Sequence, residues 1–264
     1  MIAFARKNLA LLTKNMAPKA YIISYPKSGR TWLRCLIGKY LCENNGIAEN
    51  RMLRTRYMTS AGGLLRAQFI HDGSATIKNR PHEHLPADKN KYKDFKVILL
   101  TRDLKDTLVS SYFQTTRRND IFEGTIADFI RSENFGAVKI LKFYKQWYEQ
   151  QNIPNDFLFI RYEDLHEHPE AVLKKVLFFL GASDVSQAAM HSAIEFCHFK
   201  NLKKIETQRK FNSRILSAAD KNDPDSFKMR KGLVGNYKAY LSDEDIEYIH
   251  AELNQYSSGF TDTI

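Results

Sequence analysis

Short apolar runs alternate along the chain with longer segments in which apolar residues recur every three or four positions. The runs cover residues 21–25, 64–70, 95–101 and 157–162. Most of them are rich in β-branched or aromatic residues, which favour buried strands. The helical spacing covers residues 31–41, 105–116, 126–150, 169–180, 187–197 and 243–254. Strands that alternate with helices predict an α/β fold with a central, mostly parallel β-sheet flanked by helices.

The organisation of the chain predicts one domain over residues 1–264, since no repeat, low-complexity segment or linker divides it. Residues 1–20 are expected to form an N-terminal arm or a surface helix, and residues 74–90 a polar loop. No apolar run is long enough to span a membrane. Cys35, Cys42 and Cys197 have neither metal-binding spacing nor a disulfide framework. We therefore expect a cytoplasmic protein without a metal site.

The net charge of +10 indicates an anionic partner or substrate. Nucleic acid would be one such anionic partner, but the lysines and arginines are scattered along the sequence. No helix-turn-helix, RNP or zinc-finger signature accompanies them. We therefore expect no nucleic-acid partner, and an anionic nucleotide cofactor explains the charge more economically.

The first predicted strand leads directly into a loop suited to a phosphate. The residues are Tyr25-Pro26-Lys27-Ser28-Gly29-Arg30-Thr31-Trp32, and helical spacing begins at Thr31. Free N–H groups at a helix N-terminus attract anions, and Lys27, Arg30 and Thr31 add two cations and a hydroxyl. The segment is not a Walker A loop, because G-x-x-x-x-G-K-[ST] is absent.

A second group of candidate residues lies at the end of the strand at 95–101. Arg102 ends this strand, and Ser110 follows about two turns along the next helix. A cation at the tip of a core strand is costly unless an anion pairs with it. A Mg²⁺-dependent phosphoryl-transfer enzyme would need a carboxylate at this strand end. Asp103 keeps a kinase in consideration, but Arg102 favours binding of phosphate by protein cations.

A third group lies near the C-terminus. Residues 227–238 read Phe-Lys-Met-Arg-Lys-Gly-Leu-Val-Gly-Asn-Tyr-Lys, so basic side chains adjoin Gly232 and Gly235. Glycines let a backbone approach a phosphate closely. On its own, this pattern is equally typical of a solvated basic turn.

Together these segments resemble the motifs of sulfotransferases that use 3′-phosphoadenosine 5′-phosphosulfate (PAPS). The first resembles Y-P-K-S-G-T-T-W, with Arg30 in place of a Thr. The second is similar to R-[DN]-x-x-D-x-x-x-S and the third to R-K-G-x-x-G-D-W-K, with Asn236-Tyr237 replacing Asp-Trp. The resemblance implies a P-loop NTPase-like sulfotransferase fold, PAPS as cofactor, and release of 3′-phosphoadenosine 5′-phosphate (PAP).

The resemblance also implies roles for individual residues. The loop residues Lys27, Ser28, Gly29, Arg30 and Thr31 are expected to bind the 5′-phosphosulfate. The residues expected at the 3′-phosphate are Arg102, Ser110, Arg230, Lys231 and Gly232, with Met229 in the same segment. The base is expected to contact Trp32, Tyr162 and Phe199. Cys197 stands where the family usually has a Thr in this last segment, and we include it in the cofactor site.

The catalytic groups are expected to be Lys27 and a histidine. Lys27 would stabilise the charge that grows on the bridging oxygen, and a neutral His would take the proton of the acceptor. His71 ends a predicted strand at the position of the family's K-T-H motif, although the preceding Lys-Thr is absent. His84 is a rival and His82 stands behind both; we favour His71.

The acceptor is not identified by the sequence. Basic and polar loops at 51–60, 74–90 and 204–225 make a polar or anionic small molecule plausible, with a sugar or glycolipid as an alternative. Transfer to oxygen or to nitrogen and the oligomeric state also stay open. Two rival functions are a P-loop kinase of small molecules and a non-catalytic nucleotide or nucleic-acid binder.

Overall fold

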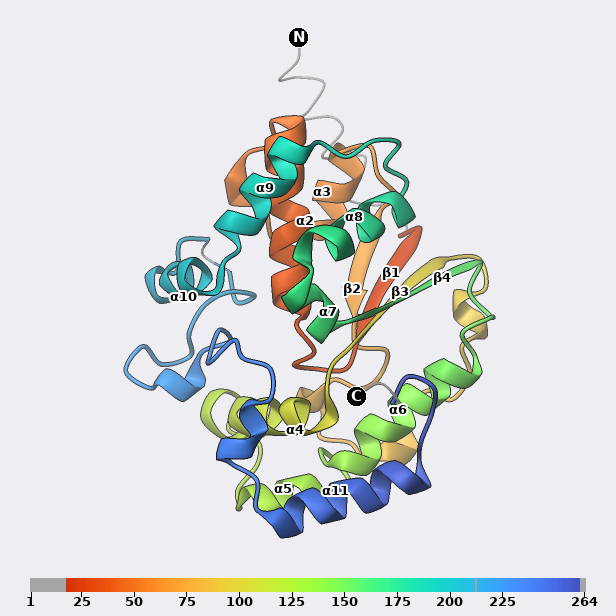
Figure 1. Ribbon diagram of the computed structural model, residues 1–264, viewed down its shortest axis with the longest axis vertical. Coiled ribbons are helices and arrows are strands. Elements are labelled where there is room, and N and C mark those ends of the chain that lie inside the picture. Colours follow the sequence, from red (N-terminus) through yellow and green to blue (C-terminus); the bar gives the residue numbers. More distant parts are fainter. Residues whose placement is uncertain (1–17, 212, 262–264) are drawn as a thin grey trace.

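A four-stranded parallel sheet forms the centre of the protein (Figure 1). The computed structural model describes residues 18–211 and 213–261. The strands are β1 (Ala20–Ser24), β2 (Ala67–Ile70), β3 (Lys96–Thr101) and β4 (Asp156–Arg161), in the spatial order β2-β1-β3-β4. The predicted arm at residues 1–20 lies almost entirely outside the described residues, and residue 20 already belongs to β1.

Helices connect these strands and cover the sheet. The α-helices of the described ranges are α2 (Arg30–Asn45), α3 (Thr55–Ala61), α4 (Leu104–Phe113), α5 (Ile126–Arg131), α6 (Ala137–Glu149), α7 (Tyr162–Glu167), α8 (Pro169–Phe179), α9 (Gln187–Phe196), α10 (Phe199–Gln208) and α11 (Asp243–Gln255). A π-helical turn, η5 (Gln114–Arg118), continues α4. The short 3₁₀ turns are η1 (Glu49–Arg51), η2 (Thr76–Lys78), η3 (His82–His84), η4 (Asn90–Tyr92), η6 (Pro224–Ser226) and η7 (Asn236–Ala239).

Each face of the sheet has its own hydrophobic core. Successive residues of a strand point to opposite faces, so Ile22 and Ile98 pack with α2, α8 and α9, whereas Ile23 and Leu99 pack with α4, α6 and α11. Figure 1 shows these two helical layers on either side of the strands. The predicted α/β fold with a parallel sheet and helices on both faces is therefore confirmed.

The carboxyl ends of the four strands lie at one edge of the sheet, and the connections diverge there. From β1 the chain passes to β2 on one side, and later to β3 on the other. Such a switch point leaves a crevice at the carboxyl ends of the strands, where α/β proteins bind ligands. The loop after β1 therefore lies at the expected position for a ligand site.

The single helix predicted over residues 126–150 is wrong, because α5 ends at Arg131 and α6 begins at Ala137. A capping box of Thr125 and Asp128 begins α5. Between the two helices Gly136 has an extended backbone, and a Cβ there would lie 2.4 Å from the carbonyl oxygen of Ile130. This close approach of two backbones ends the helical run.

Four other features differ from the prediction. The second strand begins at Ala67 rather than at residue 64, because Leu65 N–H donates instead to Leu180 O at 2.8 Å. Two helices, α3 and α10, lie where we expected loops. The first helix continues to Asn45, where Gly46 ends it in a left-handed conformation.

None of the helices within the described ranges combines the length and the apolar character needed to cross a membrane.

Candidate active site

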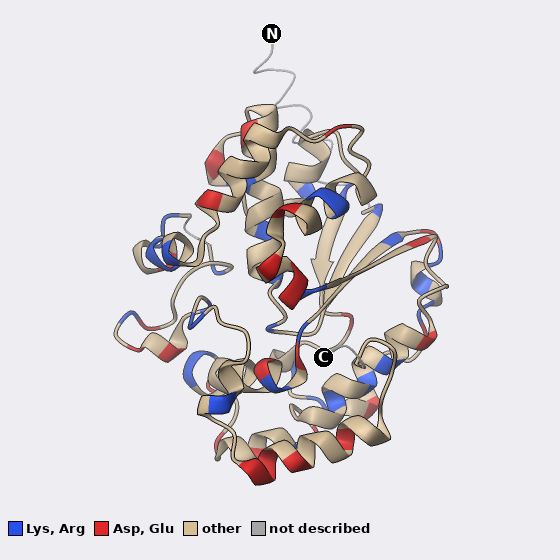
Figure 2. Cartoon of the chain, in the orientation of Figure 1, with Lys and Arg blue, Asp and Glu red and all other residues tan. Residues whose placement is uncertain are grey.

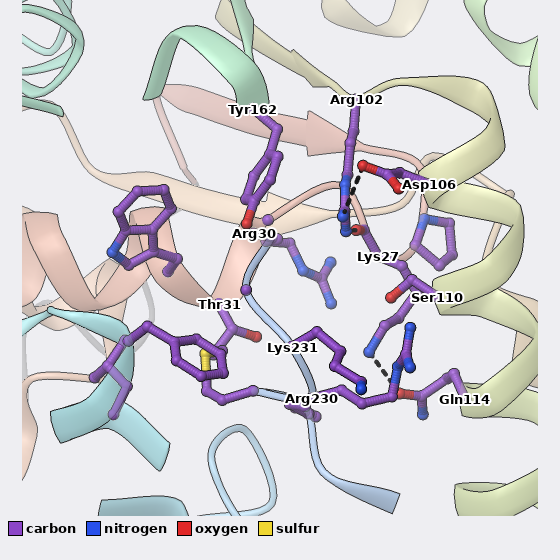
Figure 3. Close-up of a pocket in the computed structure, with 18 of the residues that line it drawn as sticks. Lys27, Arg30, Thr31, Arg102, Asp106, Ser110, Gln114, Tyr162, Arg230 and Lys231 are labelled. Carbon is purple, nitrogen blue, oxygen red and sulfur yellow. Dashed lines mark hydrogen bonds and ion pairs between the residues drawn. The ribbon is translucent and has the colours of Figure 1, made fainter. Parts of the chain in front are cut away.

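A cavity of about 580 Å³ lies at the carboxyl ends of the strands. The loop after β1, the start of α2, the end of β3, α4 and the segment 228–236 form its walls. Figure 3 shows Lys27, Arg30, Arg102 and Arg230 extending toward it from these separate elements. All three sequence segments with predicted phosphate contacts therefore lie around one cavity.

The loop after β1 makes a tight turn that exposes the start of α2. Lys27 has a φ of 73° and Gly29 a φ of 90°, both in the left-handed region. A Cβ on Gly29 would lie 2.4 Å from Cδ2 of Tyr162, so this position also requires a glycine for space. No side chain caps the first turn of α2. Trp32 N–H donates to Gly29 O at 3.0 Å, so the N–H groups of Arg30 and Thr31 are those available for an anion.

Lys27 occupies the floor of the cavity among other cations. Its Nζ donates to Oε1 of Gln114 at 3.2 Å. Burial, with a contribution from the nearby charges of Lys228 and Arg118, lowers the pKa of Lys27 to about 7. An anion bound beside Lys27 would favour its charged form.

Arg102 is held in position from several sides. Its guanidinium donates to Lys27 O at 3.3 Å and to Leu233 O at 3.2 Å, and it lies 3.4 Å from the carboxylate of Asp106. The same guanidinium stacks 4.5 Å from the ring centroid of Tyr162. Asp106 in turn accepts from the N–H groups of Gly235 (2.8 Å) and Tyr237 (3.0 Å). One carboxylate thus joins the end of β3 to the C-terminal segment. Ser110 lines the cavity one turn beyond it.

The C-terminal segment 228–232 forms another wall, and Met229, Arg230, Lys231 and Gly232 all line the cavity. Arg230 stacks 4.2 Å from the ring centroid of Phe113 and donates to the hydroxyl of Tyr240 at 2.8 Å. Its guanidinium lies 3.5 Å from Asp225. The arginine is therefore held at the cavity wall before any ligand binds.

Gly232 brings this segment against α10. It has a φ of 67°, and a Cβ there would lie 2.2 Å from Cδ2 of Phe199. The glycine is thus needed both for its backbone conformation and for contact with a predicted base-binding aromatic.

Sequence reasoning missed Glu206, which fixes the position of the same segment. Its fully buried carboxylate accepts from the N–H groups of Lys228 (2.8 Å) and Met229 (2.9 Å), and it lies 4.0 Å from Arg118. The apolar spacing of residues 199, 202 and 205 could have revealed α10, but no sequence pattern singled out its glutamate.

Aromatic side chains also line the cavity, in contact with the phosphate-binding segments. Trp32, Tyr162 and Phe199 all contribute, with Trp32 and Tyr162 edge to face at 5.9 Å. Cys197 does not line the cavity: its thiol is fully buried, and its carbonyl accepts from Nε1 of Trp32 at 3.0 Å. Ser28 is likewise buried beneath the loop rather than on the cavity wall. Contacts between these residues and a cofactor stay predictions.

Among the three candidate histidines, His71 lines the cavity. Its Nδ1 lies 2.9 Å from Ser24 O; because a carbonyl oxygen only accepts, Nδ1 carries the proton and Nε2 keeps its lone pair. Burial and the nearby Arg30 lower the pKa of His71 to about 3, so the ring is neutral at physiological pH. His84 is exposed outside the cavity lining, and Nδ1 of His82 lies 2.9 Å from Glu83.

The loop that carries His71 is anchored by a buried ion pair. Nζ of Lys89 lies 2.8 Å from Asp72, and both side chains have no exposed surface. The hydroxyl of Tyr92 donates to the same carboxylate at 2.7 Å. This network, which the sequence did not suggest, fixes the end of β2.

A comparison with known proteins agrees with this geometry. The family model of the sulfotransferase domain matches residues 17–260. Sulfotransferase 1 family member D1 of mouse is 28% identical over 233 residues, which cover 82% of this chain and 76% of that protein. Cytosolic sulfotransferase 15 of Arabidopsis thaliana is 28% identical over 262 residues, covering 87% of this chain and 69% of that protein.

A solved structure gives the same result for the fold. The crystal structure of mouse sulfotransferase SULT7A1 complexed with PAP superposes with a TM-score of 0.63 at 20% identity, covering 97% of this chain and 92% of that one. Together with the match over residues 17–260, this confirms the predicted class of enzyme, a PAPS-dependent sulfotransferase: the chain belongs to the sulfotransferase family.

Proposed function

We propose that this protein transfers the sulfuryl group of PAPS to a hydroxyl or amine of a small-molecule acceptor by in-line displacement. The observation that carries the proposal is the convergence of Lys27, Arg102 and Arg230 on one cavity with a neutral histidine in its wall. The relatives named cytosolic sulfotransferases support action in the cytoplasm.

The residues of the cavity fit a nucleotide that carries two separate anionic groups. The uncapped start of α2, together with Lys27 and Thr31, offers one set of donors to a 5′-phosphosulfate. Arg102, Ser110, Arg230 and Lys231 offer a second set to a 3′-phosphate. The aromatic wall suits an adenine ring, since its side chains present both faces and edges.

Lys27 and His71 then carry the transfer. PAPS supplies an activated sulfuryl group, whose sulfur forms a bond to the acceptor atom while its bond to the bridging oxygen breaks with the electron pair. Lys27 stabilises the negative charge left on the phosphate. Nε2 of His71 takes the proton of the acceptor, and Ser24 O keeps the ring in the tautomer that can do so. Proton transfer of this kind typically contributes about 10²–10⁴-fold to a rate.

Calorimetric titration tests the proposal. PAP is titrated without metal, and ATP with Mg²⁺ serves as the comparison, for the wild type and Arg102→Ala. We expect metal-independent binding of PAP that weakens at least about a hundredfold in Arg102→Ala, because a fixed guanidinium is lost together with its contacts to Lys27 O and Leu233 O. Preference for ATP with Mg²⁺, or no binding of either nucleotide, would refute it.

A further inference from the structure

Two arginines at the start of α2 lack the acidic partners that such positions normally require. Arg30 and Arg34 stand one turn apart on this helix, and its first turn contains no acidic residue. Like charges four residues apart repel, and cations are unfavourable at the positive end of a helix. Within the described residues Arg30 forms no hydrogen bond or ion pair, and Arg34 stacks 4.6 Å from the ring centroid of Phe69. Their positions are thus unfavourable unless an anion joins them.

Lys228 faces these arginines from the C-terminal segment. It lines the cavity, and its Nζ donates to Arg214 O (3.1 Å) and Ile215 O (2.9 Å), which leaves one donor unused. Burial and the charges of Arg118 and Arg30 lower the pKa of Lys228 to about 7. Glu206 is the acidic residue near Lys228. Its carboxylate already accepts hydrogen bonds from two backbone N–H groups and lies 4.0 Å from Arg118. The cations around Lys228 therefore outnumber the carboxylate that faces them.

The position of Arg30 and Arg34 relative to the sheet separates them from Arg102 and Ser110, whereas Lys228 belongs to the same segment as Arg230. Arg34 stacks on Phe69 of β2, and the charges of Arg30, Arg34 and Lys228 all act on His71, which follows β2. Arg102 and Ser110 follow β3, on the opposite side of β1. Figure 3 shows Arg30 extending from the start of α2 into the cavity. The cluster thus lies on the side of the cavity where His71 would meet the acceptor.

Other polar groups line the same cavity. Gln114 and Asn119 both contribute, joined by a hydrogen bond of 3.1 Å, and Thr76 contributes from the loop after β2. Figure 2 shows several acidic residues along α11, at the lower edge of the view. The cavity therefore offers an acceptor hydrogen bonds as well as positive charge.

We propose that Arg30 and Lys228, with Arg34 behind Arg30, form a subsite for an anionic group of the acceptor beside His71. The acceptor is then a small hydroxyl or amine compound that already carries a carboxylate, phosphate or sulfate. Arg30 also belongs to the loop expected to bind the 5′-phosphosulfate, so it adjoins both sites. The inference rests on the proposed sulfuryl transfer and deepens it, because it names the chemical class of the acceptor and the residues that select it.

Matched pairs of compounds test the subsite. The pairs are para-hydroxyphenylacetate with para-hydroxyphenylacetamide, and glycerol phosphate with glycerol. For each compound, calorimetry measures binding to the PAP-saturated protein, and labelled PAPS measures sulfated product. We expect the anionic member to be favoured about tenfold or more in at least one pair, since a charge-assisted contact is lost in its neutral partner.

Variants then assign the preference to named residues. Lys228→Met and Arg34→Met should each lower the anionic preference about tenfold or less, and the double variant should lower it further, to the part that Arg30 supplies. Lys200→Met is the matched control, because it removes the same charge from an exposed position outside the cavity lining. It should leave the preference unchanged. The affinity for PAP, measured in parallel, should change less than about threefold in Arg34→Met and Lys200→Met.

The outcomes separate this inference from the proposed function. If the wild type binds PAP but favours no anionic compound over its neutral partner, the subsite is refuted and the sulfotransferase proposal stands. A preference that is unchanged in the double variant Lys228→Met/Arg34→Met also refutes it. If the wild type does not bind PAP at all, the proposed function fails and the subsite fails with it.

Discussion

The cations on the two sides of the cavity differ in their interaction partners. On the β3 side, Arg102 is paired with Asp106 and bonded to two carbonyls, and Arg230 is held by Tyr240 and Asp225. On the β2 side, Arg30 has no partner within the described residues, and the contact of Arg34 is with the ring of Phe69.

The difference separates two ways of preparing for an anion. Donors that are already fixed lose little conformational entropy on binding, so the β3 side is arranged in advance for a phosphate. Cations without counter-charges repel one another until a ligand neutralises them, so the β2 side gains more from charge than from geometry. The predictions below test this contrast, from the largest expected effect to the smallest.

Substitution of His71 should separate catalysis from nucleotide binding. An asparagine can still donate to Ser24 O but has no basic nitrogen, so His71→Asn should lower kcat about a hundredfold or more. The affinity for PAP should change less than about threefold, because His71 lies on the acceptor side. The measurements are turnover with labelled PAPS and calorimetry with PAP. His84→Asn, at an exposed position, is the control. Equal losses in both variants would contradict the assignment of His71.

Removal of Glu206 should destabilise the folded protein. Glu206→Ala leaves two buried N–H groups without an acceptor and Arg118 without its carboxylate, so the free energy of unfolding should fall by about 3 kcal/mol. Urea unfolding measures this change. Glu195→Ala, on the exposed surface of α9, should change it by less than about 0.5 kcal/mol. If the two variants unfold at the same urea concentration, Glu206 does not hold the segment.

Two glycines of the C-terminal segment form a matched pair. Both have positive φ, but a Cβ on Gly232 would meet Phe199, whereas a Cβ on Gly235 would meet nothing within 4 Å. Gly235→Ala should therefore only reduce stability, by about 1–2 kcal/mol. Gly232→Ala should in addition displace Phe199 and weaken PAP binding about tenfold. Calorimetry on both variants checks this, and equal affinities would show that Phe199 does not contact the nucleotide.

The pH dependence of PAP binding should report the charge of Lys27 and Lys228. Both have a pKa of about 7 without ligand, and a bound anion favours the charged lysines. Binding between about pH 7 and 9 should therefore take up protons, and the affinity should fall as the pH rises through this range. Calorimetry at pH 8 in buffers of different ionisation enthalpy measures the uptake.

A control isolates the lysine contribution to this uptake. Phosphate groups with a second pKa near 6 are already ionised at pH 8, so PAP itself contributes little. Lys27→Met should reduce the proton uptake. Adding Lys228→Met should reduce it further if the bound nucleotide interacts with the charges of both lysines. A binding heat that does not depend on the buffer would show that neither lysine changes its protonation.

The parts of the fold that the sequence predicted depend on local patterns. The β1, β3 and β4 strands are continuous apolar runs, and their identification needs no knowledge of distant contacts. The sequence did not predict the division between α5 and α6, because it depends on the close approach of Gly136 to Ile130 O. The start of β2 was also not predicted, because it depends on a hydrogen bond from Leu65 N–H to Leu180 O. These contacts join segments whose packing is not visible in the local pattern.

Prediction of the site from the sequence has the same limit. The motifs located Lys27, Arg102 and Arg230, because their neighbours in the chain resemble family segments. Glu206 and Gln114 act through contacts with residues more than twenty positions away, so no local pattern marks them. The sequence could name the residues of the cavity but not which of its cations lack counter-charges.

The bonds of Asp106 also have a consequence for the synthesis of the protein. Its carboxylate accepts from Gly235 and Tyr237, which the ribosome adds 129 and 131 residues later. The sheet and its helices can form as they emerge, whereas the nucleotide site is complete only after residue 237 has emerged. PAP or PAPS therefore cannot stabilise the chain through the complete site before residue 237 has emerged.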